Sequence, residues 1–237
     1  MSATEEVLAF AQSATPPAQA LECARAELTT FHQAARRGID SPVVRALGEL
    51  SVAADTPAWA AWLRGTSAVL GAGEQPEWVA VCAAASALSD TEDHPCTAVA
   101  LAVGYRVAEW IAATLGPAHV AAGWCARATA GTVGAAAAAG RLLDLDVDQQ
   151  RHALGICATQ AAGLSSAEGT DAGALQIGKA ANNAVEAVLL GRHGFTSSAR
   201  PLEGRRGLFA LMSATAGQSQ PLDPLGRDWR RQFGQFT

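Results

Sequence analysis

One short polar loop of this chain brings an acid, a hydroxyl and an imidazole together between two apolar stretches. Asp90, Thr91 and His94 stand close together, and Pro95 begins the next apolar stretch. The first turn of a helix offers unpaired amide groups and the positive end of the helix dipole, which favour a bound carboxylate. His94 and Asp90 are therefore candidate catalytic residues, an acid–base pair that moves a proton next to a carbonyl group. The alternative is that Asp93 and His94 only cap the following helix.

Lys179 is the only lysine of the chain, which otherwise uses arginine for its basic side chains. A lysine ammonium is a compact point charge whose pKa can be lowered, so Lys179 is a third candidate catalytic residue. Helical spacing places it on one face with Gln176, Asn183 and Glu186, opposite an apolar stripe. The alternative is an ordinary solvated face that keeps one lysine by chance.

The cysteines and histidines show no spacing that is typical of a metal site. Five cysteines and five histidines are widely separated, with no C-x-x-C pair and no histidines four residues apart on one helix. We therefore expect no metal site. Cys125 or Cys157 would need a neighbouring histidine to act as a nucleophile. None stands in the local pattern, so both are interpreted as small buried side chains.

Prolines and small residues indicate the elements that position these side chains. Six prolines follow a small, polar or turn residue and precede a helical pattern, where the missing proline N–H costs nothing. Hydrophobic residues make up 49% of the chain but aromatic residues only 5%, a composition that suits helix-on-helix contacts rather than a β-sandwich. We predict an all-α fold, an orthogonal bundle of about ten helices without a convincing strand.

The predicted helices cover most of one domain, residues 1–210, and a polar tail follows over 211–237. They run over 2–13, 16–37, two short segments from 42 and from 57, 75–88, 95–115, 118–129, 132–143, 146–163, 171–191 and 201–212.

Charge and hydropathy argue against two classes of partner. The formal net charge is −5 and no long basic run exists, so we expect neither nucleic acid nor an acidic membrane as a partner. The longest uninterrupted apolar runs are too short for a membrane span, and the N-terminal residues lack the basic start of a signal peptide. We expect a cytoplasmic protein.

Several segments, in this order, resemble one enzyme family. VLGAGEQPEWVAVCAAASALSDTEDHP comes first, followed by GAAAAAGRLLDLDVDQQRHALGICATQAAGL, LQIGKAANNAVEAVLLGRHGFT and LEGRRG. Together they resemble the helical domain of the MmgE/PrpD family, which includes 2-methylcitrate dehydratases, cis-aconitate decarboxylases and iminodisuccinate epimerases. The resemblance implies cofactor-free proton chemistry next to a carboxylate, in a dimer. Family members also carry an α/β lid domain, which we expect this chain to lack.

The resemblance carries the family's site residues over only in part. Asp90-Thr91 and His94-Pro95 match family pairs, and Lys179 matches the lysine of Gly-Lys-Ala-Ala, whose helix packs beside that loop in the family. Neutral residues stand at other family positions: an acid falls on Ser89 or Ala87, histidines fall on Ser86 and Cys125, and a Lys-x-x-His pair falls on Gly173 and Gln176. We therefore expect a substrate less anionic than methylcitrate, contacted by Thr91, Ser89, Cys125, Gln176 and Asn183.

These observations predict a cofactor-independent lyase, isomerase or cyclase that moves a proton next to a carbonyl or carboxylate of a small molecule. The Ala- and Arg-rich composition is typical of a GC-rich bacterium, in which an altered homologue would serve specialised metabolism. We expect a homodimer held together by small-residue faces. The alternative is a non-catalytic binding or scaffold subunit that pairs with a separate chain carrying the lid.

Overall fold

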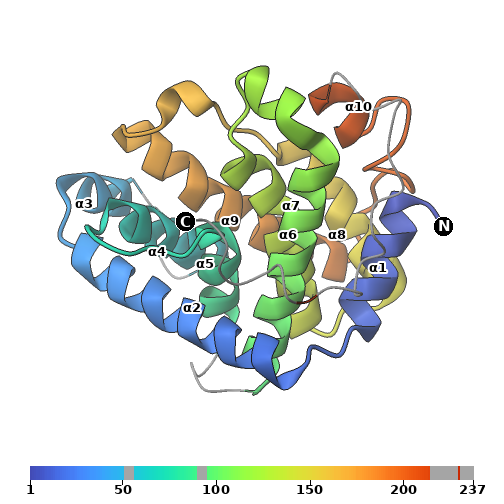
Figure 1. Ribbon diagram of the computed structural model, residues 1–237, viewed down its shortest axis with the longest axis horizontal. Helices are drawn as coiled ribbons and strands as arrows, with labels where there is room; N and C mark the ends of the chain where they lie inside the picture. The colour runs from blue at the N-terminus through green and yellow to red at the C-terminus, as the bar shows by residue number, and fades with distance from the viewer. Residues whose placement is uncertain (51–55, 90–94, 214–228, 230–237) are drawn as a thin grey trace.

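Helices form most of the part of the chain that the computed structural model describes, residues 1–50, 56–89, 95–213 and 229. The loop residues 90–94 lie outside it. The helices are α1 (Ala3–Ser13), α2 (Ala18–Gly38), α3 (Pro42–Glu49), α4 (Pro57–Leu70), α5 (Val79–Leu88), α6 (Pro95–Ala121), α7 (Ala126–Leu142), α8 (Val147–Gln160), the 3-10 turn η1 (Ser165–Ala167), α9 (Asp171–Arg192) and α10 (Leu208–Met212) (Figure 1). These described residues contain no strand, only an isolated bridge between Trp124 and Leu164, so the all-α prediction is confirmed.

Capping residues begin several helices where the sequence predicts. Ser2 and Glu5 form a capping box at the start of α1, and Asp146 and Gln149 form another at the start of α8. In each box one side chain accepts a bond from a backbone amide that the helix leaves unpaired, while the other binds back to the cap. These short patterns fix where the helices begin.

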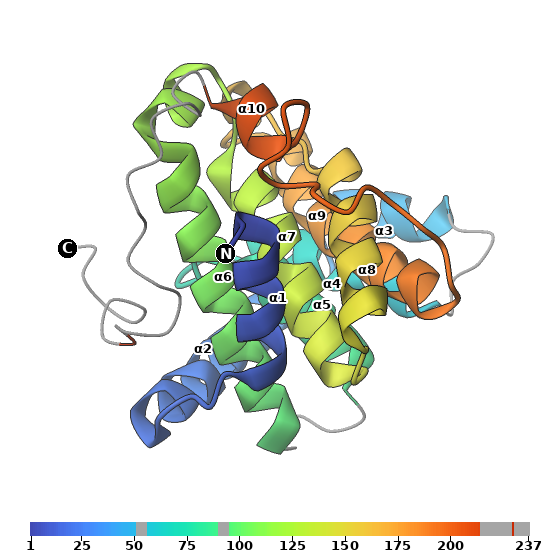
Figure 2. The same ribbon diagram turned by 90° about the vertical axis from the view of Figure 1, so that its right-hand side faces the viewer.

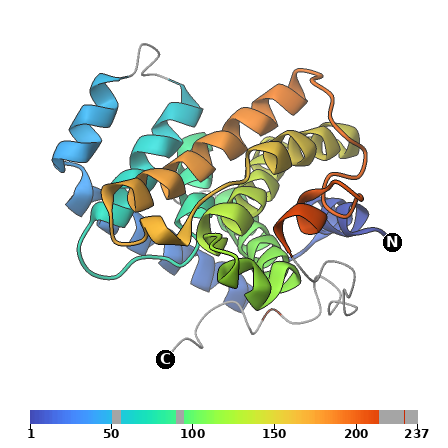
Figure 3. The same cartoon turned by 90° about the horizontal axis from the view of Figure 1, so that it is seen from above.

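Two pairs of helices dominate the packing. α6 packs along α7 in the centre of the fold, and α4 packs along α9, with α5 between α4 and α7. α2 packs against α4 and α6, and α8 packs beside α9 (Figures 1 and 2). α3 and α10 lie at opposite ends of the molecule when it is viewed from above (Figure 3).

Glycines permit the closest approach within both pairs. A Cβ atom added to Gly65 of α4 would lie 2.9 Å from the Cα of Gly178 on α9. A Cβ atom on Gly134 of α7 would lie 2.5 Å from the carbonyl oxygen of Gly104 on α6. Real Cβ atoms essentially never come so close, so the backbones would have to separate. These small-residue faces are therefore buried within a single chain.

The apolar stripe predicted for the helix after residue 170 is confirmed in α9. Its members Ala174, Ile177, Ala181, Ala184 and Val188 are each at most 3% exposed. The opposite face is not wholly solvated, because Asn182 is also only 3% exposed.

The helix break predicted at Gly116-Pro117 is present, because Gly116 has φ 66° and ψ −177°, outside the helical range, between the two helical stretches of α6. Two other predicted boundaries are wrong. The helix expected over 118–129 does not form as a unit, since α6 ends at Ala121 and a separate α7 spans Ala126–Leu142. α7 thus joins the end of that expected helix to the Ala-rich segment. The helix expected from Pro201 is shorter, since turns precede α10.

Candidate functional site

The two ends of the 90–94 loop are tied together, although the loop itself, with Asp90, Thr91 and His94, lies outside the described residues. Ser89 follows α5 directly, and its hydroxyl lies 2.9 Å from the hydroxyl of Thr97 in the first turn of α6. The Ser89 hydroxyl also lies 2.8 Å from the carbonyl oxygen of Ala85, to which it can donate. The chain therefore enters and leaves the loop at one place, beside the amino end of α6.

A second set of polar side chains meets at the same end of α5. Ser86, buried in its last turn, has its hydroxyl oxygen 3.0 Å from Nε2 of His32 on α2. Arg64 on α4 donates from Nη1 to that oxygen at 2.9 Å. Because the guanidinium can only donate, the Ser86 hydroxyl keeps its own hydrogen for an acceptor, and a neutral His32 offers one at Nε2. We call His32, Arg64, Ser86, Ser89 and Thr97 the α5-end cluster.

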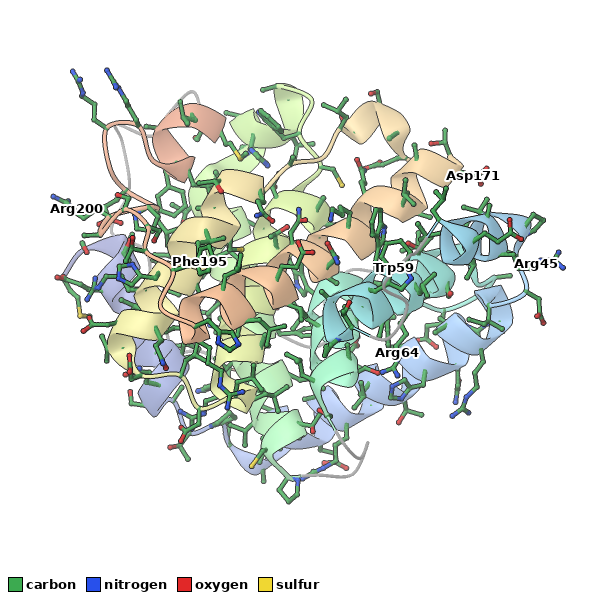
Figure 4. All side chains as sticks on the ribbon, turned by 180° about the vertical axis from the view of Figure 1, so that it is seen from behind. Arg45, Trp59, Arg64, Asp171, Phe195 and Arg200 are labelled. Atoms are coloured by element: carbon green, nitrogen blue, oxygen red, sulfur yellow. The ribbon has the colours of Figure 1, made fainter. Side chains whose placement is uncertain are left out.

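Arg64 also closes the end of α5. Its Nη1 donates to the carbonyl oxygen of Ser86 at 2.6 Å, one of the carbonyls that a helix leaves unpaired in its last turn. Figure 4 shows Arg64 beyond Trp59 along α4. One cation thus joins α4 to α5 and places positive charge beside the chain that enters the loop.

Three of the expected substrate contacts lie elsewhere, around the connection after α8. Gln176 accepts a bond from the amide of Leu164 at 3.0 Å and donates to its carbonyl oxygen at 3.1 Å. Asn183 donates to the carbonyl oxygen of Gln160 at 3.2 Å. The amide of Cys125 donates to the carbonyl oxygen of Gly163 at 3.0 Å, with the Cys125 side chain buried. Gln176, Asn183 and Cys125 are therefore brought to one part of the fold, but there they bind the backbone of the 160–164 connection.

Lys179 faces α4 rather than that connection. Its ammonium lies 4.5 Å from the centre of a ring of Trp62 and also donates to the side-chain oxygen of Asn182. Trp62 is in turn held by a bond of 3.2 Å from its Nε1 to the carbonyl oxygen of Leu175. A cation over an aromatic face is stabilised by the ring's quadrupole. Lys179 is therefore held by side chains of α4 and α9, and is not a freely solvated lysine.

The surroundings of Cys157 make its thiol chemically unreactive. Its Sγ donates to the carbonyl oxygen of Thr132 at 3.2 Å, and complete burial raises the pKa of its thiol far above the ordinary range. A thiol that cannot ionise is a poor nucleophile. The interpretation of Cys157 as a core residue agrees with this environment.

Two partly buried acids, Glu27 on α2 and Glu109 on α6, were not selected from the sequence. The hydroxyl of Tyr105 donates to Glu27 at 2.9 Å; burial raises the pKa of Glu27, and this bond opposes the shift. Burial also raises the pKa of Glu109 to about 7, against the attraction of Arg106, whose Nη1 lies 3.6 Å from its carboxylate. Glu109 is therefore a candidate for proton exchange near neutral pH.

No metal site and only one apolar helix of membrane length occur in the part of the chain that the structure describes. No group of three or more His, Cys, Asp or Glu side chains there could hold an ion. α6 is long and apolar enough to cross a membrane, but 72% of its most apolar window is buried inside the protein. That degree of burial is typical of a core helix.

The comparison with known families decides the relationship. A family model described as the MmgE/PrpD N-terminal domain matches residues 76–220, more than half of the chain. The chain belongs to the MmgE/PrpD family. No curated protein matches it. Membership of the MmgE/PrpD family accounts for the all-helical fold and supports a lyase- or isomerase-like function in general terms.

Two members of the α5-end cluster lie outside the matched MmgE/PrpD segment. His32 and Arg64 precede residue 76, and neither was selected from the sequence as a site residue. The one signal for this cluster in the sequence was Ser86, because the resemblance to the MmgE/PrpD family places a histidine of the family at this position. In the structure, the imidazole of His32 lies against that serine hydroxyl.

Proposed function

We propose that this chain is a cofactor-independent cytoplasmic lyase, isomerase or cyclase. It moves a proton next to a carbonyl or carboxylate of a small molecule, in bacterial specialised metabolism. One observation carries the proposal: the bond between Ser89 and Thr97 brings both ends of the 90–94 loop to the amino end of α6, while Arg64 binds Ser86 in the last turn of α5. The positive end of the α6 dipole and a guanidinium at the end of α5 favour a substrate carboxylate or a developing enolate oxygen.

In the proposed reaction, His94 takes the proton as a neutral imidazole and Asp90 orients it. Ser89 and Thr91 contact the substrate at the same loop. Lys179 supplies positive charge where negative charge develops on the substrate oxygen, and a cation near His94 favours the neutral imidazole. The other expected contacts, Cys125, Gln176 and Asn183, are bound to backbone in the structure and are assigned to shaping the site.

The proposal is tested without knowing the full reaction. The protein is incubated in heavy water with a panel of small 2-keto acids, hydroxy acids and ketones, and deuterium incorporation next to the carbonyl is followed by NMR. We expect exchange with at least one compound, lowered at least about a hundredfold by His94→Ala or Lys179→Met. His193→Ala, which changes an exposed histidine after α9, is the matched control. Exchange that is absent from the wild type, or equal in all four proteins, contradicts the proposal.

The oligomeric state is proposed to be a homodimer. The small-residue faces first assigned to the interface are buried within the chain, so the proposal now rests on exposed apolar side chains such as Ile39, Leu50 and Phe195, which are about half to three-quarters exposed. Light scattering after gel filtration should give twice the chain mass. A soluble monomer refutes the dimer. If the protein aggregates alone but becomes soluble when a neighbouring gene is co-expressed, the binding-subunit alternative is favoured.

A further inference from the structure

A groove of about 950 Å³ lies between α8 and the chain that leads into α10, away from the residues assigned to proton transfer. Its apolar lining comes from both walls: Ile156, Ala158 and Ala161 on one side, and Leu208, Leu211 and Met212 on the other. Its volume is at the upper end of the range of small-ligand sites, about 300–1,000 Å³. The groove is large enough for an extended apolar chain.

The wall opposite α8 is held in place by contacts on both sides. The amide of Ser197 donates to Nδ1 of His152 at 3.1 Å, which ties this wall to α8. Glu203 accepts bonds from the amide and hydroxyl of Thr4 at 3.0 and 2.6 Å, which tie it to α1. Leu202 between them is fully buried. The groove is therefore a formed feature and not a gap beside a loose segment.

The charged side chains that line the groove are all cations. Arg200, Arg205 and Arg206 line it, and no aspartate or glutamate does. Arg200 is paired with Glu203 at 3.1 Å, whereas Arg205 and Arg206 form no ion pair with any acid of the described chain. In a protein of net charge −5, a groove lined only by positive charges selects an anion. Arginine also presents paired donors that match a carboxylate.

We propose that this groove binds an aliphatic monocarboxylate, with its chain on the apolar lining and its carboxylate between Arg205 and Arg206. The alkyl chain of the ligand covers Leu211, which is otherwise 71% exposed, and removes the apolar surface of this side chain from water. The carboxylate meets two cations that have no acidic partner in the described structure. This ligand need not be the substrate of the proposed proton transfer, since none of the residues assigned to that reaction lines the groove.

The test uses decanoate, with decanol as its uncharged counterpart, by calorimetry below their aggregation concentrations. We expect saturable binding of decanoate and binding of decanol at least about tenfold weaker, the effect of two exposed charge contacts. The double variant Arg205→Ser/Arg206→Ser should weaken decanoate binding about tenfold. Arg25→Ser/Arg45→Ser, with the same change of charge at other exposed arginines, should leave it unchanged. Figure 4 shows Arg45 at the opposite end of the molecule from Arg200.

A second pair of variants tests the apolar lining. Leu211→Ser should weaken the binding of both decanoate and decanol severalfold. Leu50→Ser changes a leucine that directly follows α3 and is 75% exposed, and it should change the binding of neither compound. Because both leucines are exposed, neither variant should unfold the protein. No saturable decanoate binding, equal affinity for decanol, or arginine variants that bind normally would each overturn the proposal. So would a glutamate-rich peptide that binds in place of decanoate, since it would make the groove a protein-docking site.

Discussion

The α5-end cluster and the 160–164 connection both hold residues that the family resemblance pointed to, but they use polar side chains differently. At the connection, Gln176 and Asn183 bind backbone groups of Leu164 and Gln160. At the end of α5, the Ser86 hydroxyl binds the side chains of His32 and Arg64, which come from two other helices. Backbone bonds fix a fold, whereas side-chain bonds between hydroxyl, imidazole and guanidinium leave protons that can be rearranged.

The difference suggests a division of roles that can be tested. The family resemblance places basic residues of the family at the positions of Cys125 and Gln176, and in the structure both of these neutral residues bind at the connection. The α5-end cluster instead keeps a cation and an imidazole beside the loop that contains Asp90 and His94. We infer that proton transfer belongs to this end of α5 and that the connection only supports it.

The largest effect is expected from Arg64. Arg64→Ala removes the donor to both the hydroxyl and the carbonyl oxygen of Ser86 and takes positive charge from the flank of the loop. Proton exchange should fall about a hundredfold. Arg45→Ala, at an exposed arginine of α3, should have no effect. Deuterium incorporation measures both, with circular dichroism to verify folding, and a folded Arg64→Ala protein of full activity would remove the cluster from the mechanism.

A smaller effect is expected from Glu109, twelve residues beyond Thr97 and therefore about 18 Å along α6. Burial raises its pKa from 4.5 to about 7, so its contribution to stability is fully present below pH 4.5 and is lost as the pH rises through 7. Between pH 4.5 and 8, the unfolding free energy of the wild type should fall by about 2 kcal/mol relative to Glu109→Gln. Urea unfolding at both pH values measures this. Parallel pH dependences would show that Glu109 titrates normally.

The smallest effect is expected at the connection. Gln176→Ala removes two bonds to the backbone of Leu164, and because the site is partly exposed, it should cost about 1 kcal/mol of stability. Gln33→Ala, at an exposed glutamine of α2, is the control. Thermal unfolding reports the difference. Should Gln176→Ala leave the melting temperature unchanged while exchange is abolished, the roles of the two regions would be reversed.

Local patterns predicted the fold well because their causes are local. The capping boxes at Ser2 and Asp146 and the apolar stripe of α9 involve residues a few positions apart, so spacing alone reveals them. The break at Gly116-Pro117 was predicted for the same reason, whereas the second break, between Ala121 and Ala126, was missed because no proline marks it.

The contacts of the α5-end cluster could not be predicted, because they join separate segments of the chain. His32 and Ser86 are 54 residues apart, and Arg64 and Ser86 are 22 apart, so their contacts depend on how α2, α4 and α5 pack. The spacing of residues within one helix cannot predict a contact between side chains of different helices. Likewise, spacing placed Gln176 and Lys179 on one face of α9 but could not show that one binds Leu164 while the other faces Trp62.

The most direct test of the central claim compares the two regions in one assay. Deuterium incorporation next to a carbonyl is measured for His94→Ala and for Gln176→Ala, each expressed per folded molecule and relative to the wild type. If the loop beside α5 carries the reaction, His94→Ala loses at least about a hundredfold while Gln176→Ala stays within about twofold. Equal losses in the two variants, or a loss confined to Gln176→Ala, would contradict the assignment of proton transfer to the end of α5.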